Sequence, residues 1–122
     1  MVKYILVMGG KDKEVPKDKE LADSIQEARR NAYGILSKTG YPIVIGRLVK
    51  ENRKTHGKYV GQVFLMDLGN AGHRIVWNTD SKKSVGAYMV TTTYLLNKDG
   101  TLGECLDPFV KIERSIKRKG RL

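Results

Sequence analysis

The sequence has few of the residues that form disulfides, hold metals or cross membranes. It contains one cysteine, Cys105, and two histidines, His56 and His73, among 122 residues. A single cysteine cannot form an internal disulfide, and structural zinc normally takes four nitrogen or sulfur ligands. The longest uninterrupted apolar run, residues 4–8, is far shorter than the ~20 residues of a transmembrane helix. We therefore expect a cytoplasmic protein without a disulfide, a metal or another cofactor.

Acidic residues are also scarce, and the excess of basic residues is unevenly placed. The chain has 23 Lys and Arg against 13 Asp and Glu, a net charge of +10. Residues 47–58 hold five cations and one acid, a net charge of +4, and residues 111–122 hold six cations and one acid, a net charge of +5. The remaining residues therefore carry only +1. Such concentrated positive charge is typical of proteins that bind polyanions, most often nucleic acid, although it also occurs as a solvated face that keeps a protein soluble.

Motifs that would indicate an enzyme are missing. Neither G-x-G-x-x-G nor G-K-[ST] occurs, so no phosphate-cradling loop is indicated. Cys105 follows Glu104, whose charge would raise the pKa of the thiol and disfavour the thiolate nucleophile. We therefore expect Cys105 to be a semi-buried, inert side chain and the protein not to be an enzyme.

One amphipathic helix is predicted over residues 18–38. Its apolar residues fall on one face at 100° per residue, and Gly40 follows the expected end, as is usual for helices. The predicted buried face consists of Leu21, Ile25, Ala28, Ala32, Ile35 and Leu36.

The rest of the chain has the alternating pattern of β-strands. Strands are predicted at residues 3–8, 43–49, 58–67, 73–78, 85–96 and 101–105, with turns at 51–57, 68–72, 79–84 and 97–100. These turns are too short for parallel crossovers, which need a dozen residues or more. The predicted fold is therefore α+β: one helix packed on a twisted antiparallel sheet of about five to six strands, in the order strand, helix, five strands. Residues 1–110 would form this single domain and residues 111–122 a basic C-terminal tail.

The candidate site consists of the cations in the two basic stretches. No residue is placed for reading base edges, so binding through backbone phosphates with low sequence specificity is expected. If six to eight phosphates were neutralised, the logarithm of the affinity would fall with the logarithm of salt concentration at a slope of about −5 to −7. The predicted nucleic-acid-binding residues are Arg47, Lys50, Arg53, Lys54, Lys58, Lys117, Arg118, Lys119 and Arg121.

Two alternatives stay open on the sequence alone. Tyr59, Tyr88 and Tyr94 would stack on unpaired bases if exposed, or would simply cover a half-wet face of the sheet. The protein would also suit a role as a protein-binding or assembly module, a subunit of a complex or virus-like particle, that uses an edge or face of its sheet.

Overall fold

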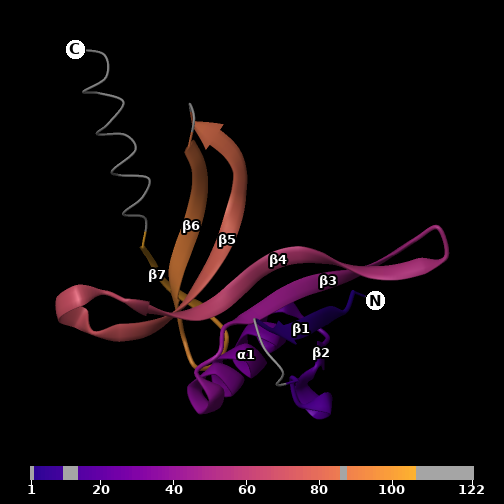
Figure 1. The fold of residues 1–122 in the computed structure, drawn as a ribbon, viewed down its shortest axis with the longest axis horizontal. Coiled ribbons are helices and arrows are strands. Elements are labelled where there is room, and N and C mark those ends of the chain that lie inside the picture. The colour runs from indigo at the N-terminus through magenta and orange to yellow at the C-terminus, as the bar shows by residue number, and fades with distance from the viewer. Residues whose placement is uncertain (1, 10–13, 86–87, 107–122) are drawn as a thin grey trace.

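The chain folds as one helix packed on a seven-stranded antiparallel sheet (Figure 1). The computed structural model describes residues 2–9, 14–85 and 88–106, and the side chains of all of these except 80–85 and 88–91. The strands lie in the order β2-β1-β3-β4-β5-β6-β7, and every neighbouring pair is antiparallel. The predicted α+β class is confirmed, with one or two strands more than expected. The elements are β1 (Tyr4–Met8), the 3-10 turn η1 (Lys17–Lys19), β2 (Leu21–Ala22), α1 (Ile25–Thr39), β3 (Ile43–Glu51), β4 (Lys54–Asp67), the 3-10 turn η2 (Gly69–Ala71), β5 (His73–Val85), β6 (Tyr88–Leu96) and β7 (Leu102–Leu106).

The helix begins seven residues later than its apolar pattern predicts. Ser24 is the N-cap, and its hydroxyl accepts a hydrogen bond from the Glu27 amide at 3.1 Å. The Glu27 carboxylate accepts the Asp23 amide in return at 3.0 Å, so Ser24-x-x-Glu27 acts much as a capping box. Leu21, expected on the buried helix face, instead lies on the edge strand β2 and is 50% exposed. The predicted end is confirmed, because the Gly40 amide donates to the Leu36 carbonyl at 2.8 Å.

The hydrophobic core lies between α1 and one face of the sheet. Ala28, Ala32 and Ile35 of the helix pack onto strand residues that alternate along the sheet, as the period of two predicts. The strand side of this core consists of Leu6, Met8, Ile43, Ile45, Val63, Trp77 and Leu96. Because α1 covers β1, β3 and β4, the free length of the β3–β4 and β5–β6 hairpins extends beyond it.

A half-buried arginine joins the helix to the β6–β7 turn. The Nε–H of Arg29 donates to the Gly100 carbonyl at 2.9 Å, and its guanidinium lies 5.4 Å from the centre of the Trp77 ring. Burial lowers the pKa of Arg29, partly opposed by Tyr4. The turn at 97–100 is confirmed by the bond from the Gly100 amide to the Asn97 carbonyl, 2.9 Å long. These contacts fix the β6–β7 turn against α1.

Two predicted loops are wrong because the strands on either side are longer than expected. The chain reverses between β3 and β4 with only Asn52 and Arg53, where residues 51–57 were expected to form a turn. Residues 79–84 lie within β5, which pairs with β6 across a register shift between Asp80 and Ser84. As a result, two long hairpins diverge from the core, β3–β4 to the right and β5–β6 upward in Figure 1.

Candidate nucleic-acid interface

The first basic stretch forms the outer part of the β3–β4 hairpin, here called the basic ribbon (residues 47–58). Its two strands are in register from Arg47↔Lys58 to Glu51↔Lys54, five cross-strand pairs joined by a two-residue turn. All its residues are exposed except Leu48 and Val49, which are half-buried at the base. The ribbon projects past the sheet and the helix (Figure 1). A basic sequence segment thus becomes a projecting arm held by backbone hydrogen bonds.

The tip of the ribbon has an unusual backbone. Asn52 has a φ of 51° and Arg53 a φ of 64°, the only positive φ angles of non-glycine residues in the part of the chain that the structure describes. Two consecutive positive φ angles match the type I′ turn, whose right-handed twist suits a hairpin. Asn adopts this conformation readily, whereas Arg does so at a cost. The turn therefore places a cation at the tip, at a position where glycine would be more stable.

Cations lie on both faces of the ribbon. Residues opposite each other in an antiparallel pair share a face, and neighbours along a strand alternate between faces. Arg47 and Lys58 are paired, as are Glu51 and Lys54, and all four fall on one face. Lys50 is on the opposite face. A ligand that touched only one face would miss part of this charge.

One carboxylate accompanies the ribbon's five cations. Glu51 lies 3.6 Å from the ammonium of Lys58 and 3.9 Å from Nε2 of His56. These side chains are about half exposed, and an ion pair at such a site contributes at most about 1 kcal/mol. Among the described residues, no carboxylate oxygen lies within ion-pair distance of the other four cations. The ribbon therefore keeps most of its positive charge uncompensated.

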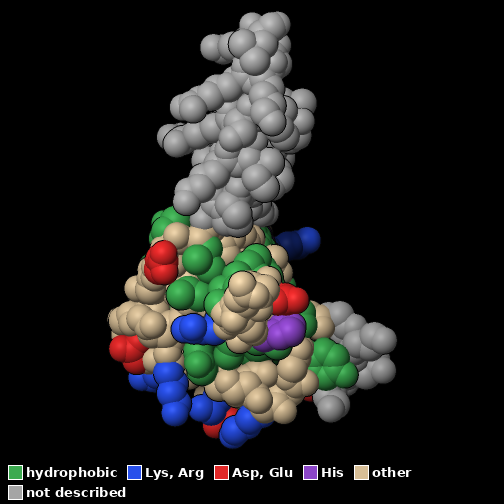
Figure 2. Space-filling model, turned by 90° about the vertical axis from the view of Figure 1, so that its left-hand side faces the viewer, with side chains coloured by type: hydrophobic (Ala, Val, Ile, Leu, Met, Phe, Trp, Pro, Cys, Tyr) green, Lys and Arg blue, Asp and Glu red, His purple; other side chains and the backbone are tan. Residues whose placement is uncertain are grey.

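The structure describes five of the nine predicted nucleic-acid-binding residues. Arg47, Lys50, Arg53, Lys54 and Lys58 are brought together on one arm. The other predicted cations, Lys117, Arg118, Lys119 and Arg121, lie outside the described residues. On the face opposite the ribbon tip, acidic side chains lie among the basic ones (Figure 2).

Sequence reasoning missed the role of Asn52. The residue was taken as part of a polar loop, but its tolerance of positive φ permits the tight reversal that extends both strands. The signal was present, since Asn is the residue after glycine most often found in this conformation. His56, which falls in the predicted turn at 51–57, is a strand residue of β4 near Glu51.

The tyrosines considered for base stacking and the single cysteine differ in how exposed they are. Tyr94 is half-buried and packs against the core, so it does not offer an open stacking face. Tyr59 is 48% exposed at the base of the ribbon, and the side chain of Tyr88 lies outside the description. Cys105 is exposed rather than semi-buried. In the described residues no three His, Cys, Asp or Glu side chains cluster as a metal site would require.

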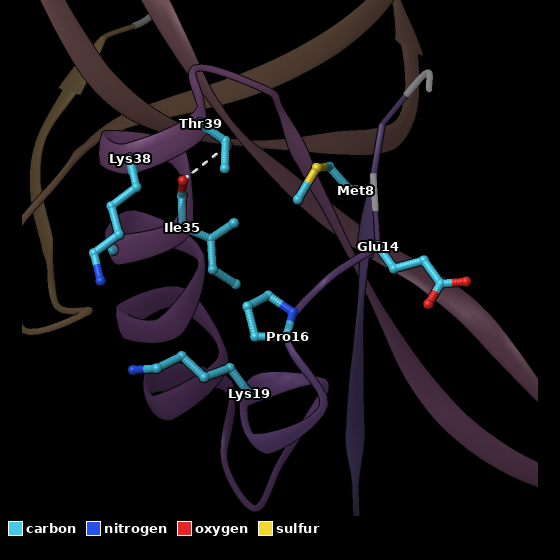
Figure 3. A pocket seen from close by; sticks show the side chains of 8 residues that line it. Met8, Glu14, Pro16, Lys19, Ile35, Lys38 and Thr39 are labelled. Carbon is cyan, nitrogen blue, oxygen red and sulfur yellow. Dashed lines mark hydrogen bonds between the residues drawn. The ribbon is translucent and has the colours of Figure 1, made fainter. Parts of the chain in front are cut away.

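A pocket of about 350 Å³ lies between α1 and the chain that leads into η1 (Figure 3). Its lining is largely carbon, including Met8, Pro16 and Ile35, beside Gly34, which has no side chain to fill the space. The Thr39 hydroxyl already donates to the Ile35 carbonyl at 2.8 Å. Ligand pockets usually combine an apolar lining with several convergent polar groups. Glu14, Lys19 and Lys38 also line this pocket, but it has fewer cations than the basic ribbon and includes an acid, so the ribbon is the stronger candidate for a polyanion.

Comparison with known proteins adds no family to these observations. No protein-family model matches the chain, and no curated protein or solved structure is significantly similar to it. No helix in the described ranges has the length and apolar character needed to span a bilayer.

Proposed function

We propose that this protein binds nucleic acid through phosphate contacts of low sequence specificity, as a non-enzymatic binding protein. The observation that carries the proposal is the basic ribbon, a projecting arm on which four of five cations have no carboxylate partner among the described residues. Exposed, unpaired cations can neutralise phosphates, and this releases the counterions condensed on the nucleic acid, which favours binding. The C-terminal residues 117–121 supply the second contact in this proposal.

The backbone at the ribbon tip supports the same proposal. A non-glycine residue at positive φ lowers the stability of the protein, and such residues are most often kept where the surrounding structure or the function requires them. Arg53 is exposed, so burial of its side chain does not explain an arginine there. Sites where a sequence departs from the locally favoured residue are often functional. A cation carried at the farthest point of the arm is well placed to reach a phosphate.

The proposal makes the affinity strongly dependent on salt. Each cation that neutralises a phosphate of a duplex contributes about −0.9 to the slope of log affinity against log salt. The expected slope for the whole protein is about −5 to −7, for six to eight phosphates. A variant with Arg47, Lys50, Arg53 and Lys54 all changed to Gln should have a slope smaller in magnitude by about 3.6.

The experiment is a fluorescence anisotropy titration of a labelled 20-base-pair DNA at several salt concentrations. The ribbon variant is compared with a tail variant, in which Lys117, Arg118, Lys119 and Arg121 become Gln. The matched control changes four exposed lysines outside both stretches, Lys17, Lys19, Lys38 and Lys98, and so removes the same charge. We expect both test variants to reduce the slope more than the control. Binding that ignores salt, or an equal loss in the control, would contradict the proposal.

A second candidate function is an assembly module that uses the sheet face away from α1. Ile5, Val7, Val44 and Tyr59 share this face through the register of β1, β3 and β4, and Val7 is 52% exposed. This function predicts self-association in nuclease-treated protein, seen as concentration-dependent sedimentation, and its loss in Val7→Lys. Sedimentation as a monomer at all concentrations would reject it.

A further inference from the structure

We infer that the ligand of the basic ribbon is double-stranded DNA and that the ribbon enters the major groove. This inference rests on the proposed nucleic-acid binding and adds the form of the nucleic acid and the mode of contact. It follows from the ribbon's dimensions, from the distribution of its cations and from its lack of aromatic residues.

The ribbon has the dimensions of a groove-binding element. Arg47 still pairs with Tyr4 of β1, and the Leu48 amide donates to the Lys3 carbonyl, so the free part of the ribbon is three cross-strand pairs, from Val49↔His56 to Glu51↔Lys54, and a two-residue turn. At about 3.4 Å per residue this part projects roughly 10 Å, with strands about 4.8 Å apart. The major groove of B-form DNA is about 12 Å wide and 8.5 Å deep and admits a two-stranded ribbon. The minor groove, about 6 Å wide, does not admit one without being opened. The major groove of A-form RNA is deep and too narrow for side chains to read.

The placement of charge on the ribbon matches a groove better than a flat surface. A groove presents phosphates on both walls, so a ligand inside it needs cations on both faces. Arg47, Lys54 and Lys58 lie on one face and Lys50 on the other, with Arg53 at the tip. A single strand lying against one face would leave the cation on the other face in water.

The composition of the ribbon argues against unpaired bases as the main ligand. Residues 47–58 contain no Phe, Tyr or Trp. Proteins that hold single strands usually stack successive bases on aromatic rings, at about 1–3 kcal/mol per base. Two rings lie at its base: Tyr59 is on the face that carries Gly46, and the half-buried Tyr4 of β1 pairs with Arg47. Without a series of rings, duplex binding through phosphates is the better fit.

The test compares four labelled ligands with the full chain at one fixed salt concentration. They are a 20-base-pair DNA duplex, the single strand, the matching RNA duplex, and the same DNA duplex with glucosylated 5-hydroxymethylcytosine, whose sugars fill the major groove. We expect the plain DNA duplex to bind about tenfold more tightly than each of the other three, since a blocked or absent groove removes several contacts. Netropsin, which occupies the minor groove, should change the affinity less than about twofold.

A pair of single variants tests whether both faces make contact. Lys50→Gln and Lys54→Gln remove one charge from opposite faces, and each should weaken duplex binding by about fivefold at 0.15 M salt. Lys38→Gln on α1 removes the same charge away from the ribbon and should leave binding unchanged. Circular dichroism checks that each variant is folded.

The outcomes separate this inference from the proposed function. Equal binding of all four ligands, unchanged binding of the glucosylated duplex, or an effect of only one ribbon variant would overturn groove insertion while leaving nucleic-acid binding in place. Failure to bind any of the four ligands would overturn both.

Discussion

Replacing Arg53 with glycine should make the basic ribbon more stable and the protein a weaker binder. Arg53 sits at a φ of 64° in the two-residue turn, where an L-residue is strained and glycine is not. The same residue is the cation farthest along the projecting hairpin. A single substitution therefore separates the structural preference of the turn from the charge requirement of the proposed function.

The expected gain in ribbon stability and the expected loss of binding affinity are each about fivefold. The left-handed conformation costs an L-residue roughly 1–2 kcal/mol, and part of the gain is lost because glycine is more flexible in the unfolded chain. A net gain of about 1 kcal/mol corresponds to about fivefold greater protection of the ribbon amides from hydrogen exchange. Loss of one phosphate contact reduces the salt slope by about 0.9, which is about fivefold in affinity at 0.15 M salt.

Amide hydrogen exchange and anisotropy titration measure these two quantities on the same protein sample. Hydrogen exchange is preferred to thermal unfolding because the ribbon can open locally without unfolding the core. Arg53→Lys keeps both the charge and the strained φ, so it should match the wild type in both assays. If Arg53→Gly bound as tightly as the wild type, the tip cation would not contact phosphate. If protection of the ribbon did not rise, the turn would not be strained by arginine.

Two further predictions concern the β6–β7 turn. Gly100→Ala should destabilise the protein by about 3 kcal/mol or more in urea unfolding, because a Cβ at a φ of 91° would overlap the Gln26 carbonyl oxygen of α1. The control is Gly69→Ala, where the φ is 64° and the space is open, so that only the conformational cost of about 1 kcal/mol is lost. Equal losses of stability in the two variants would refute the close packing of Gly100 against α1. The hydrogen bonds from the Thr101 hydroxyl and amide lower the pKa of Asp99 in the folded protein. The stabilisation from these bonds is therefore fully present above the pKa of about 3.9 that Asp99 has in the unfolded chain, and it is lost as the pH falls through the lower pKa of Asp99 in the folded protein. An NMR titration should show the Thr101 amide losing protection below about pH 4, and Asp99→Asn should abolish that dependence.

The fold class could be predicted because the periodic patterns are strong where one face of an element is buried. Ala28, Ala32 and Ile35 recur at helical spacing, and Ile43 and Ile45 alternate with less buried residues, so both patterns identify the core. The start of the helix could not be placed by the same means. Leu21 fits the helical pattern by spacing, but the Ser24 cap and the pairing of β2 with β1 determine where the helix begins.

The sequence indicated which cations make up the candidate site, but it did not indicate the shape of the ribbon that carries five of them. A polar segment such as 51–57 carries no burial pattern, because both faces of the ribbon are in water, and periodicity therefore cannot identify its strands. The hairpin register is fixed instead by the turn at Asn52 and by the bulge between Ile45 and Gly46. Conformation at single residues decides whether these cations form a loose loop or a rigid arm.

The sign of the ribbon's charges favours the proposed binding role over a protective one. Charged residues on an exposed hairpin prevent other chains from pairing with its edges, and lysine is common in such positions. Either sign of charge gives that protection, so a purely protective ribbon would mix Glu with Lys and pair them across the strands, as Glu51 pairs with Lys58. The ribbon instead carries five cations to one acid, places Arg47 directly opposite Lys58, and holds an arginine in a strained turn. Repulsion and strain of this kind lower the stability of the isolated protein, and a polyanion that fills both faces would remove the repulsion on binding.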